Sequence, residues 1–252
     1  MRLASCQALK GPRNRAHAMA DSKNKGPLAR TRKRALRVGR KIVGKAPRPL
    51  SRHALVGPPD LWEEKRRFQF QFLTSRGLQP EHRLLDIGCG TLRGGIPLIE
   101  YLQTGHYTGV EARAEVLEEG RKELADSGLA HKHPLLIHAA DPAQIQLEAP
   151  FDFAWAFSVL IHMPDEVVDA YMGLVSGGLA EGGEFYANVG LGDRPEGTWQ
   201  GFPVVSRPRA TYERLAASHG LIVDDVGTLD TLGHQMGTGD RMMMLRFTRA
   251  PG

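Results

Sequence analysis

The amino-acid sequence predicts an α/β protein: a three-layer sandwich with a seven-stranded, mostly parallel sheet, an antiparallel last strand and a basic N-terminal extension. Three observations support this fold class. Residues 83–102 read as an apolar strand, a glycine-rich turn and a helix. Further apolar runs alternate with helical segments up to residue 189, as in sheets whose parallel strands are joined by helices. The last two strands follow each other without a helix, and strands joined in this way pair antiparallel.

The basic extension is visible in the distribution of charge. The chain has 252 residues and a formal net charge of +5, but residues 1–52 contain 16 of the 33 Lys and Arg residues and one acid, Asp21. This stretch has no aromatic residue, and such a composition predicts a disordered arm. Residues 53–252 contain the other 27 acidic residues. We therefore predict two parts, an arm over 1–52 and a folded domain over 53–252.

The arm has several possible roles. Residues 28–43 form a basic pattern with a modest apolar stripe, which predicts a short amphipathic helix weakened by Gly39. Its charge favours peripheral contact with an anionic membrane or with nucleic acid. A mitochondrial targeting segment and a solvated tail are also compatible with this composition.

Composition limits the class of protein. No apolar run reaches the roughly 20 residues of a membrane helix, and the N-terminus lacks the apolar segment of a secretory signal. The two cysteines, Cys6 and Cys89, lie in the arm and in the glycine turn, so we expect no structural disulfide. The histidines and cysteines show no zinc-ligand spacing, so no metal is predicted. A cytoplasmic, possibly membrane-peripheral location is expected.

The first helix is predicted to follow Pro58-Pro59. Asp60 is the expected N-cap, and Glu63 three residues later is its capping-box partner. Phe68 and Phe72 are four residues apart and share a helix face, and the helix is expected to end near Gly77.

The glycine turn after the first strand has the character of a nucleotide site. Gly88 and Gly90 let the backbone approach a ligand, since no Cβ stands in the way, and the N–H groups of the next helix start there. Asp86 adds an acceptor at the end of the strand. In the dinucleotide pattern a third glycine comes three residues after the second. Here the next glycines are Gly94 and Gly95, so a variant dinucleotide site stays open on this pattern alone.

The second and third strands each end at an acidic residue. Strand 107–111 ends at Glu111, 21 residues after Gly90, where a carboxylate can accept hydrogen bonds from ribose hydroxyls. A polar helix over 114–127 follows. Strand 133–139 leads to Asp141.

The remaining strands follow the same pattern. Residues 151–159 are nearly continuously apolar, as expected for a strand buried on both faces, and lead to Ser158 and His162. A helix is predicted from residue 165 to 176, with Gly177-Gly178 ending it, and a fifth strand over 182–189. Residues 190–206, with Trp199, are expected to form a functional loop. A helix over 208–218, a strand over 221–226, a glycine-rich connection and a strand over 241–247 close the domain.

The sequence from Asp86 through Gly88 and Gly90 resembles motif I of the class I S-adenosylmethionine (SAM)-dependent methyltransferases, and the resemblance extends over residues 60–247. It implies a Rossmann-like fold, SAM as the cofactor and methyl transfer as the activity. It also implies that the first helix, with Trp62, covers the cofactor; a purely structural role for Trp62 is the alternative.

The resemblance assigns further roles. Asp141 matches the acid that accepts from the adenine amino group, with a solvated turn residue as the alternative, and Ser158 to His162 resembles motif IV. Cofactor contacts are therefore expected from eight residues: Asp86, Gly88, Cys89, Gly90, Arg93, Glu111, Asp141 and Ser158. Arg93 is expected to pair with the carboxylate of the methionine part.

His162 is the predicted catalytic base, because an imidazole with a pKa near 6.5 can remove a hydroxyl proton near neutral pH. A packing role for His162 is the alternative, and His234, Tyr186 or Asn188 would then line the acceptor pocket. No Asn/Asp-Pro-Pro-aromatic motif follows the fourth strand, which argues against DNA-adenine methylation. A hydroxyl of a small molecule, sugar or lipid is the first expectation. The alternatives are an RNA or protein methyltransferase recruited by the arm and a non-catalytic binding protein.

Overall fold

The computed structural model describes residues 51–192, 197–234 and 242–251. The predicted basic helix over 28–43 and most of the glycine-rich connection after Gly233 lie outside these ranges. None of the helices in the described ranges has the length and apolarity needed to cross a bilayer.

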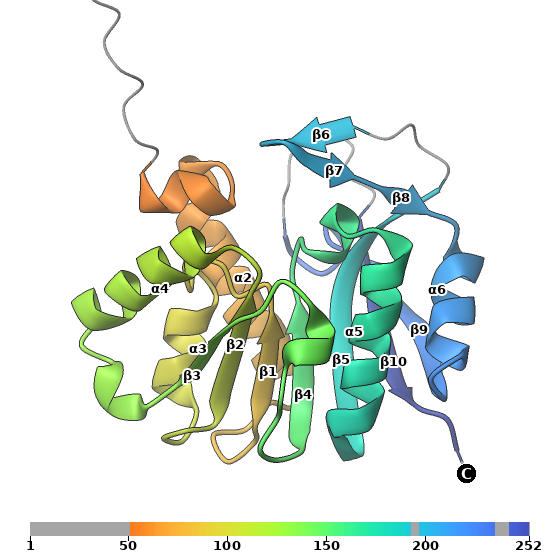
Figure 1. Ribbon diagram of the computed structural model, residues 1–252, viewed down its shortest axis with the longest axis horizontal. Coiled ribbons are helices and arrows are strands. Elements are labelled where there is room, and N and C mark those ends of the chain that lie inside the picture. Colours follow the sequence, from red (N-terminus) through yellow and green to blue (C-terminus); the bar gives the residue numbers. More distant parts are fainter. Residues whose placement is uncertain (1–50, 193–196, 235–241, 252) are drawn as a thin grey trace, which may run out of the picture. The chain divides into compact units, whose positions relative to one another are not determined.

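The sheet has the strand order β3-β2-β1-β4-β5-β10-β9 (Figure 1). The pairs from β3 to β5 are parallel, whereas β10 is antiparallel to both β5 and β9. A two-residue strand, β8 (Ser206–Arg207), pairs with the end of β5 outside this path. The predicted fold class is confirmed: seven strands make the main sheet and the last is antiparallel. Their bounds are β1 Leu84–Ile87, β2 Tyr107–Glu111, β3 Leu135–His138, β4 Phe151–Ala156, β5 Leu179–Leu191, β9 Leu221–Thr228 and β10 Met242–Arg249.

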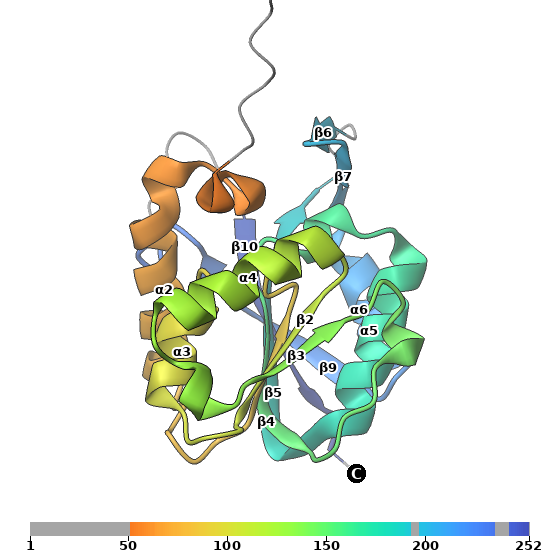
Figure 2. The same cartoon turned by 60° about the vertical axis from the view of Figure 1, so that its left-hand side comes forward.

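Helices cover both faces of the sheet (Figure 2). On one face α2 (Trp62–Ser75), α3 (Gly95–Tyr101) and α4 (Ala114–Asp126) pack through a cluster that includes Phe72, Leu98 and Leu117. On the other face α5 (Asp165–Gly178) and α6 (Arg209–Ala217) pack through a cluster that includes Met172 and Leu215. This arrangement gives the three predicted layers.

The chain order creates a switch point in the sheet. From β1 the chain moves outward to β2 and β3, and then returns to place β4 on the other side of β1. In doubly wound sheets, ligands bind beyond the carboxyl ends of the strands at such a point. The topology therefore fixes where a site is expected, between the segments that follow β1 and β4.

The expected capping box of the first helix is wrong. Residues Pro59–Leu61 form a 3-10 turn, η2, and α2 begins after it at Trp62 with Leu61 as its N-cap and no side-chain cap bond. Asp60 lies inside the 3-10 turn, because Pro59 suits the first position of a helical turn and starts it two residues earlier than expected. Glu63 instead lies 3.6 Å from Arg66 as an i,i+3 ion pair.

The glycine pair at the end of α5 does not stop the helix where predicted. Helix α5 continues through Gly178, and β5 begins directly at Leu179. A Cβ at position 178 would lie 2.5 Å from the Phe151 ring. Gly178 therefore serves close packing of α5 against the start of β4, rather than helix termination.

The segment predicted as a loop over 190–206 contains a hairpin. Strands β6 (Gly197–Trp199) and β7 (Phe202–Val204) pair antiparallel as a separate two-stranded sheet. Gln200 and Gly201 at its tip have φ values of +49° and +85°. Positive φ at both central residues is typical of the type I′ turn, which matches the twist of paired strands. We call residues 197–204 the aromatic hairpin.

A further short element precedes α2. Residues Arg52–Val56 form a 3-10 helix, η1, which Ser51 caps by accepting from the Ala54 N–H. Figure 1 shows η1 and the aromatic hairpin at the same end of the sheet.

Candidate functional site

A cavity of about 190 Å³ lies at the switch point, beyond the carboxyl ends of β1, β2 and β4. Seven of the eight predicted cofactor residues line it, and so does the predicted base, His162. The seven are Asp86, Gly88, Cys89, Gly90, Arg93, Glu111 and Ser158. The chain therefore brings these side chains together from three strand ends, although they are up to 72 positions apart in the sequence.

Asp141 is the predicted cofactor residue that does not line this cavity. It is the N-cap of η4 (Pro142–Gln144), and its Oδ1 accepts from the Ala143 N–H at 2.9 Å. The exposed carboxylate thus serves the local turn. Its expected contact with adenine stays a prediction.

The glycines of the turn are required by backbone shape and by neighbouring side chains. Gly88 and Gly90 have φ values of +70° and +59°, a region that favours glycine. A Cβ at position 88 would lie 2.5 Å from Cγ2 of Val159, and one at position 90 would lie 2.8 Å from Cγ1 of Val56. The segments after β4 and in η1 can therefore close onto the turn only because both residues are glycine.

Asp86 is a buried carboxyl group at the cavity. Burial is the main reason that its pKa is raised to about 7, and the negative charge of Glu111 adds to this effect. The Tyr107 hydroxyl donates to its Oδ2 at 2.5 Å and opposes the shift. A carboxyl group in this state favours a nearby cation, because a positive charge would stabilise its ionised form.

Arg93 is a buried cation on the same side of the cavity. Its Nη1 donates to the Val56 carbonyl at 2.8 Å, and burial lowers its pKa to about 10, so it stays charged at neutral pH. Among the described residues, its Nε has no hydrogen-bond partner and no carboxylate lies within ion-pair distance. A buried charge is costly without a partner, so this guanidinium suits an anionic ligand.

Glu111 joins the ends of two strands. Its Oε2 accepts from the Gly90 N–H at 3.1 Å, and its Oε1 accepts from the backbone N–H and the Nε of Arg113 at 3.0 and 3.2 Å. A carboxylate has about four acceptor positions, so three are used and one remains for a ligand hydroxyl.

His162 ends the 3-10 turn η5 (Leu160–His162) that follows β4. Its Nδ1 lies 2.7 Å from the Pro203 carbonyl oxygen in the aromatic hairpin. A carbonyl only accepts, so Nδ1 carries the hydrogen and Nε2 keeps the lone pair. Burial lowers the pKa of the imidazole, the hydrogen bond with Pro203 opposes this shift, and the charge of Arg113 adds to it, so the neutral ring predominates at pH 7.

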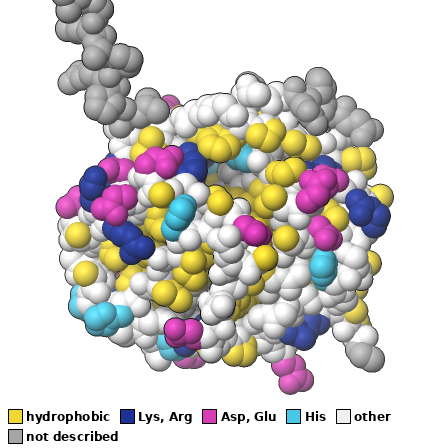
Figure 3. All heavy atoms as spheres, viewed as in Figure 1, with side chains coloured by type: hydrophobic (Ala, Val, Ile, Leu, Met, Phe, Trp, Pro, Cys, Tyr) yellow, Lys and Arg dark blue, Asp and Glu magenta, His cyan; other side chains and the backbone are white. Residues whose placement is uncertain are grey.

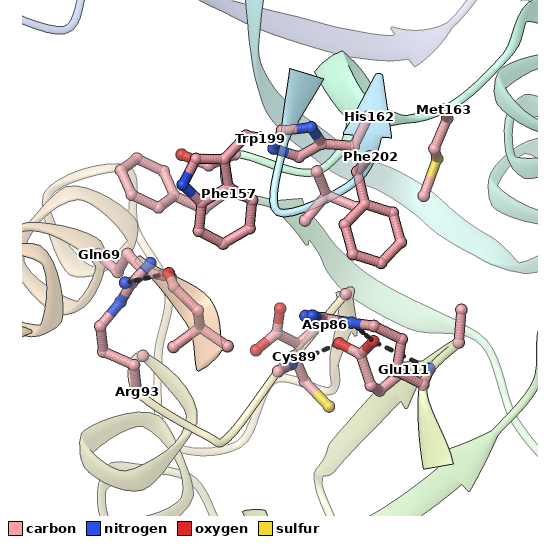
Figure 4. A pocket seen from close by; sticks show the side chains of 18 of the residues that line it. Gln69, Asp86, Cys89, Arg93, Glu111, Phe157, His162, Met163, Trp199 and Phe202 are labelled. Carbon is pink, nitrogen blue, oxygen red and sulfur yellow. Dashed lines mark hydrogen bonds and ion pairs between the residues drawn. The ribbon is translucent and has the colours of Figure 1, made fainter. Parts of the chain in front are cut away.

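The cavity has two unlike sides (Figure 4). Asp86, Arg93 and Glu111 lie on one side, which comes from the ends of β1 and β2 and from the glycine turn. Phe157, Trp199, His162 and Phe202 lie on the other. The aromatic side comes from the end of β4 and from the aromatic hairpin.

Sequence reasoning noticed Trp199 but missed Val56, Gln69 and Phe202 as lining residues. Val56 belongs to η1, and Gln69 lies on the buried face of α2, where its Oε1 accepts from the Trp155 indole at 3.0 Å. The local sequence signal for the hairpin is the dipeptide Gln200-Gly201 at its turn. This dipeptide predicts a two-residue hairpin turn less strongly than Asn-Gly does.

The alternative pocket residues lie elsewhere. The Tyr186 hydroxyl donates to Glu184 at 2.7 Å, and its ring packs against Phe72 on the α2 face. Asn188 is buried, and its Oδ1 accepts from the Ser158 N–H at 2.6 Å. His234 is buried against the Phe68 ring, with centroids 4.8 Å apart. None of Tyr186, Asn188 and His234 lines the cavity.

A family model described as a methyltransferase domain matches residues 85–185, from β1 into β5. No curated protein matches the chain. Several solved structures share its fold. A SAM-dependent methyltransferase from Clostridium acetobutylicum has 14% identity and a TM-score of 0.58, covering 75% of this chain and 92% of that one.

Two further similar structures have named activities. Magnesium protoporphyrin IX methyltransferase from Synechocystis PCC 6803, with bound SAM, has 15% identity and a TM-score of 0.58, covering 86% of this chain and 91% of its own. A glycopeptide N-methyltransferase complexed with SAM has 17% identity and a TM-score of 0.56, covering 74% and 87%.

Proposed function

We propose that this chain is a class I SAM-dependent methyltransferase and that its acceptor is a hydroxyl group of a small molecule, sugar or lipid. The observation that carries the proposal is His162. It lines the cavity as a neutral imidazole whose Nδ1–H is held by the Pro203 carbonyl, leaving the Nε2 lone pair as the base. A hydroxyl needs such a base, because its proton must leave as the oxygen gains the methyl group.

The cavity residues suit the cofactor. Arg93, buried without a carboxylate partner among the described residues, pairs with the carboxylate of the methionine part. Asp86, whose pKa of about 7 leaves it partly ionised at neutral pH, faces the ammonium group. Glu111 offers its remaining acceptor position to a ribose hydroxyl, and the glycine turn carries the backbone past the cofactor.

The chemistry of the step divides between cofactor and protein. Bound SAM supplies an activated methyl group, so the protein mainly supplies alignment and a proton acceptor. Bound SAM would supply the methyl carbon to the acceptor oxygen and would retain the electron pair of the broken carbon–sulfur bond on its sulfur. His162 Nε2 takes the hydroxyl proton and releases it to solvent after product leaves.

The cover over the cavity favours a small acceptor group. The Gln200 amide, at the tip of the aromatic hairpin, donates to the Ala54 carbonyl in η1 at 2.9 Å. The hairpin and η1 thus meet across the cavity mouth. An acceptor that enters as a small molecule or as the end of a longer chain fits beneath this bridge better than the surface of a folded macromolecule.

The second candidate is an RNA or protein methyltransferase recruited by the basic arm. The charge of residues 1–52 favours it, and the glycopeptide N-methyltransferase is a structural neighbour that acts on nitrogen. A nitrogen acceptor with a free lone pair has less need of a base. The dependence of turnover on His162 therefore discriminates between the two candidates.

The test begins with a screen for methyl transfer from labelled SAM to extracts of metabolites, glycans and lipids, with RNA and protein as parallel samples. On the acceptor found, His162→Gln should lower turnover by a factor of about 10²–10⁴, because that is the usual contribution of general base catalysis. SAM affinity measured by calorimetry should change little.

The pH profile separates a base from a packing residue. The pKa of His162 is lowered by burial, so the neutral ring predominates at pH 7 and is lost as pH falls through that pKa. Wild-type turnover at saturating SAM should therefore fall on the acid side of neutrality, and this limb should be absent in His162→Gln. Saturating SAM is needed because protonation of Asp86, with a pKa of about 7, would otherwise weaken cofactor binding in the same pH range. His131→Ala, at an exposed position, is the matched control. Full turnover in His162→Gln, or an unchanged acid limb, would refute the base assignment.

A further inference from the structure

The register of the aromatic hairpin puts two aromatic side chains on one face. Trp199 and Phe202 are direct partners across β6 and β7, on either side of the Gln200–Gly201 turn. Residues paired directly across an antiparallel ladder project to the same side of it. Both side chains line the cavity, so this face of the hairpin is turned toward the site.

The aromatic hairpin and the proposed base form one unit. The His162 ring lies 5.6 Å from Trp199 and 6.5 Å from Phe202, measured between centroids. Two hydrogen bonds fix the hairpin stem to η5: His162 Nδ1 to the Pro203 carbonyl at 2.7 Å, and the Val205 N–H to the Ile161 carbonyl at 2.8 Å. Whatever the two aromatic rings bind is therefore held beside the imidazole.

The opposite side of the cavity is occupied by ionic groups. Asp86, Arg93 and Glu111 lie there, facing the aromatic side (Figure 4). Charged groups match the ammonium, carboxylate and ribose hydroxyls of the cofactor. On the aromatic side the Arg113 guanidinium lies 5.1 Å from the centroid of the Phe202 ring, and Trp199 and Phe202 add flat apolar surface there.

We propose that Trp199 and Phe202 bind a six-membered ring of the acceptor through its flat face and present a hydroxyl on that ring to His162 Nε2. This inference rests on the proposed hydroxyl methylation. A pyranose with its axial C–H groups and a phenol with its π face share this chemistry: an apolar ring face with a hydroxyl at its edge. Indole and phenyl rings suit it, because they offer large rigid contact area with few rotatable bonds.

The energetic reason is burial of ring against ring. The faces of Trp199 and Phe202 that line the cavity are only partly covered, and both residues are of intermediate exposure. An acceptor ring placed there removes apolar surface from water on both partners. An acyclic polyol with the same number of hydroxyls cannot do this, so ring and chain acceptors should be separated by affinity.

The test measures binding without turnover. Saturation-transfer NMR on the full chain with S-adenosylhomocysteine would compare methyl α-D-glucopyranoside, catechol and the acyclic polyol sorbitol. At least one ring probe should receive saturation and sorbitol should not. Binding of the glucopyranoside would indicate a sugar acceptor, and binding of catechol would indicate a phenol acceptor.

The variants assign the binding to the hairpin. Trp199→Ala and Phe202→Ala should each lower the affinity for the ring probe at least tenfold, while the affinity for S-adenosylhomocysteine stays within twofold of the wild-type value. Trp199→Phe should restore most of the binding, which excludes general loss of structure. Phe70→Ala removes a partly buried aromatic ring that packs against Tyr101 and does not line the cavity. It is the matched control and should bind the ring probe like the wild type.

The inference would be overturned if neither ring probe bound, or if sorbitol bound as well as the ring probes. It would also be overturned if Trp199→Ala bound the ring probe as the wild type does, or if both variants lost S-adenosylhomocysteine binding in parallel. Failure of the proposed function looks different. If a ring probe bound but no methyl group were transferred to oxygen, hydroxyl methylation would be refuted and the ring-binding site would stand. Methyl transfer to an acyclic alcohol would keep the hydroxyl proposal and remove the ring site.

Discussion

At the scale of single residues, some side chains that line the cavity also hydrogen-bond to the backbone around it and fix its position. Glu111 ties the Gly90 N–H to the end of β2 through its two oxygens. Gly94 and Gly95 start α3 where added Cβ atoms would lie 2.4 Å from Gln69 Oε1 and 2.6 Å from the Tyr107 hydroxyl. The late glycines therefore serve contact with α2 and β2, which explains why the spacing differs from the dinucleotide pattern.

Replacing Glu111 with Gln should weaken SAM binding by about 10- to 100-fold. The amide keeps one acceptor oxygen but loses the charge-assisted bonds to the Gly90 N–H and to a ribose hydroxyl, and such bonds contribute roughly 1.5–3 kcal/mol each. Calorimetric titration with SAM measures the change. Glu115→Gln, at an exposed position in the first turn of α4, is the control and should bind normally. Unchanged affinity in Glu111→Gln would show that this carboxylate does not contact the cofactor.

At the scale of elements, η1 is attached to the site from two directions. Arg52 at its start lies 2.6 Å from Glu123 and 2.9 Å from Asp126 on α4, and Glu123 also pairs with Arg66 of α2 at 3.0 Å. Figure 3 shows charged side chains of both signs gathered on the side of the molecule where α4 lies in Figure 1. At its other end, Val56 packs on Gly90 and its carbonyl accepts from Arg93.

Arg52→Ala should therefore reduce SAM affinity several-fold with little loss of global stability. Partly exposed ion pairs usually contribute about 0–1 kcal/mol, so the free energy of unfolding should fall by no more than about 1 kcal/mol. The local effect is larger because η1 covers the glycine turn. Thermal melting measures the stability and calorimetry measures the SAM affinity. Arg67→Ala, at an exposed position, is the control. If SAM binds to Arg52→Ala as to the wild type, η1 is not part of the cofactor site.

At the scale of the whole molecule, charge divides the chain. Residues 1–52 carry 16 basic residues against one acid, whereas the rest carries 17 basic residues against 27 acids. We propose that the basic segment gives the enzyme a salt-sensitive attraction for anionic surfaces, because exposed charges act over a Debye length of about 8 Å at physiological salt. The acidic remainder would oppose such contact by itself.

Removing residues 1–50 should abolish this attraction and leave melting temperature and SAM affinity unchanged. The cut keeps Ser51 and Arg52, which cap and anchor η1. Sedimentation with phosphatidylserine vesicles and gel shift with RNA separate the two partners. The full chain at 1 M salt is the control, since screening there leaves a Debye length of about 3 Å. If the truncated chain bound vesicles and RNA as well as the full chain does, residues 1–50 would not be the source of the attraction.

Local sequence pattern was sufficient to predict the sheet and the residues on the polar side of the cavity, where Asp86, Arg93 and Glu111 lie. The strands β1, β2 and β4, which end at or within two residues of Asp86, Glu111 and Ser158, are short apolar runs, and the switch in chain direction follows from their order. Because parallel strands place their carboxyl ends at one edge, residues at the ends of separate strands meet there without further information. Asp141 departs from this rule because its carboxylate caps a turn of its own.

The sequence by itself determined the fold class, the glycine turn and the residues at the strand ends, since these follow from hydrophobic period and from backbone shape at glycine. Only the tertiary structure decided the other side of the cavity. The contact of His162 Nδ1–H with Pro203 and the cover of η1 over Gly90 join residues 41 and 34 positions apart. The pairing of Trp199 with Phe202 depends on a turn with weak local signals. Such contacts arise from packing between distant segments, and no periodicity within either segment encodes them.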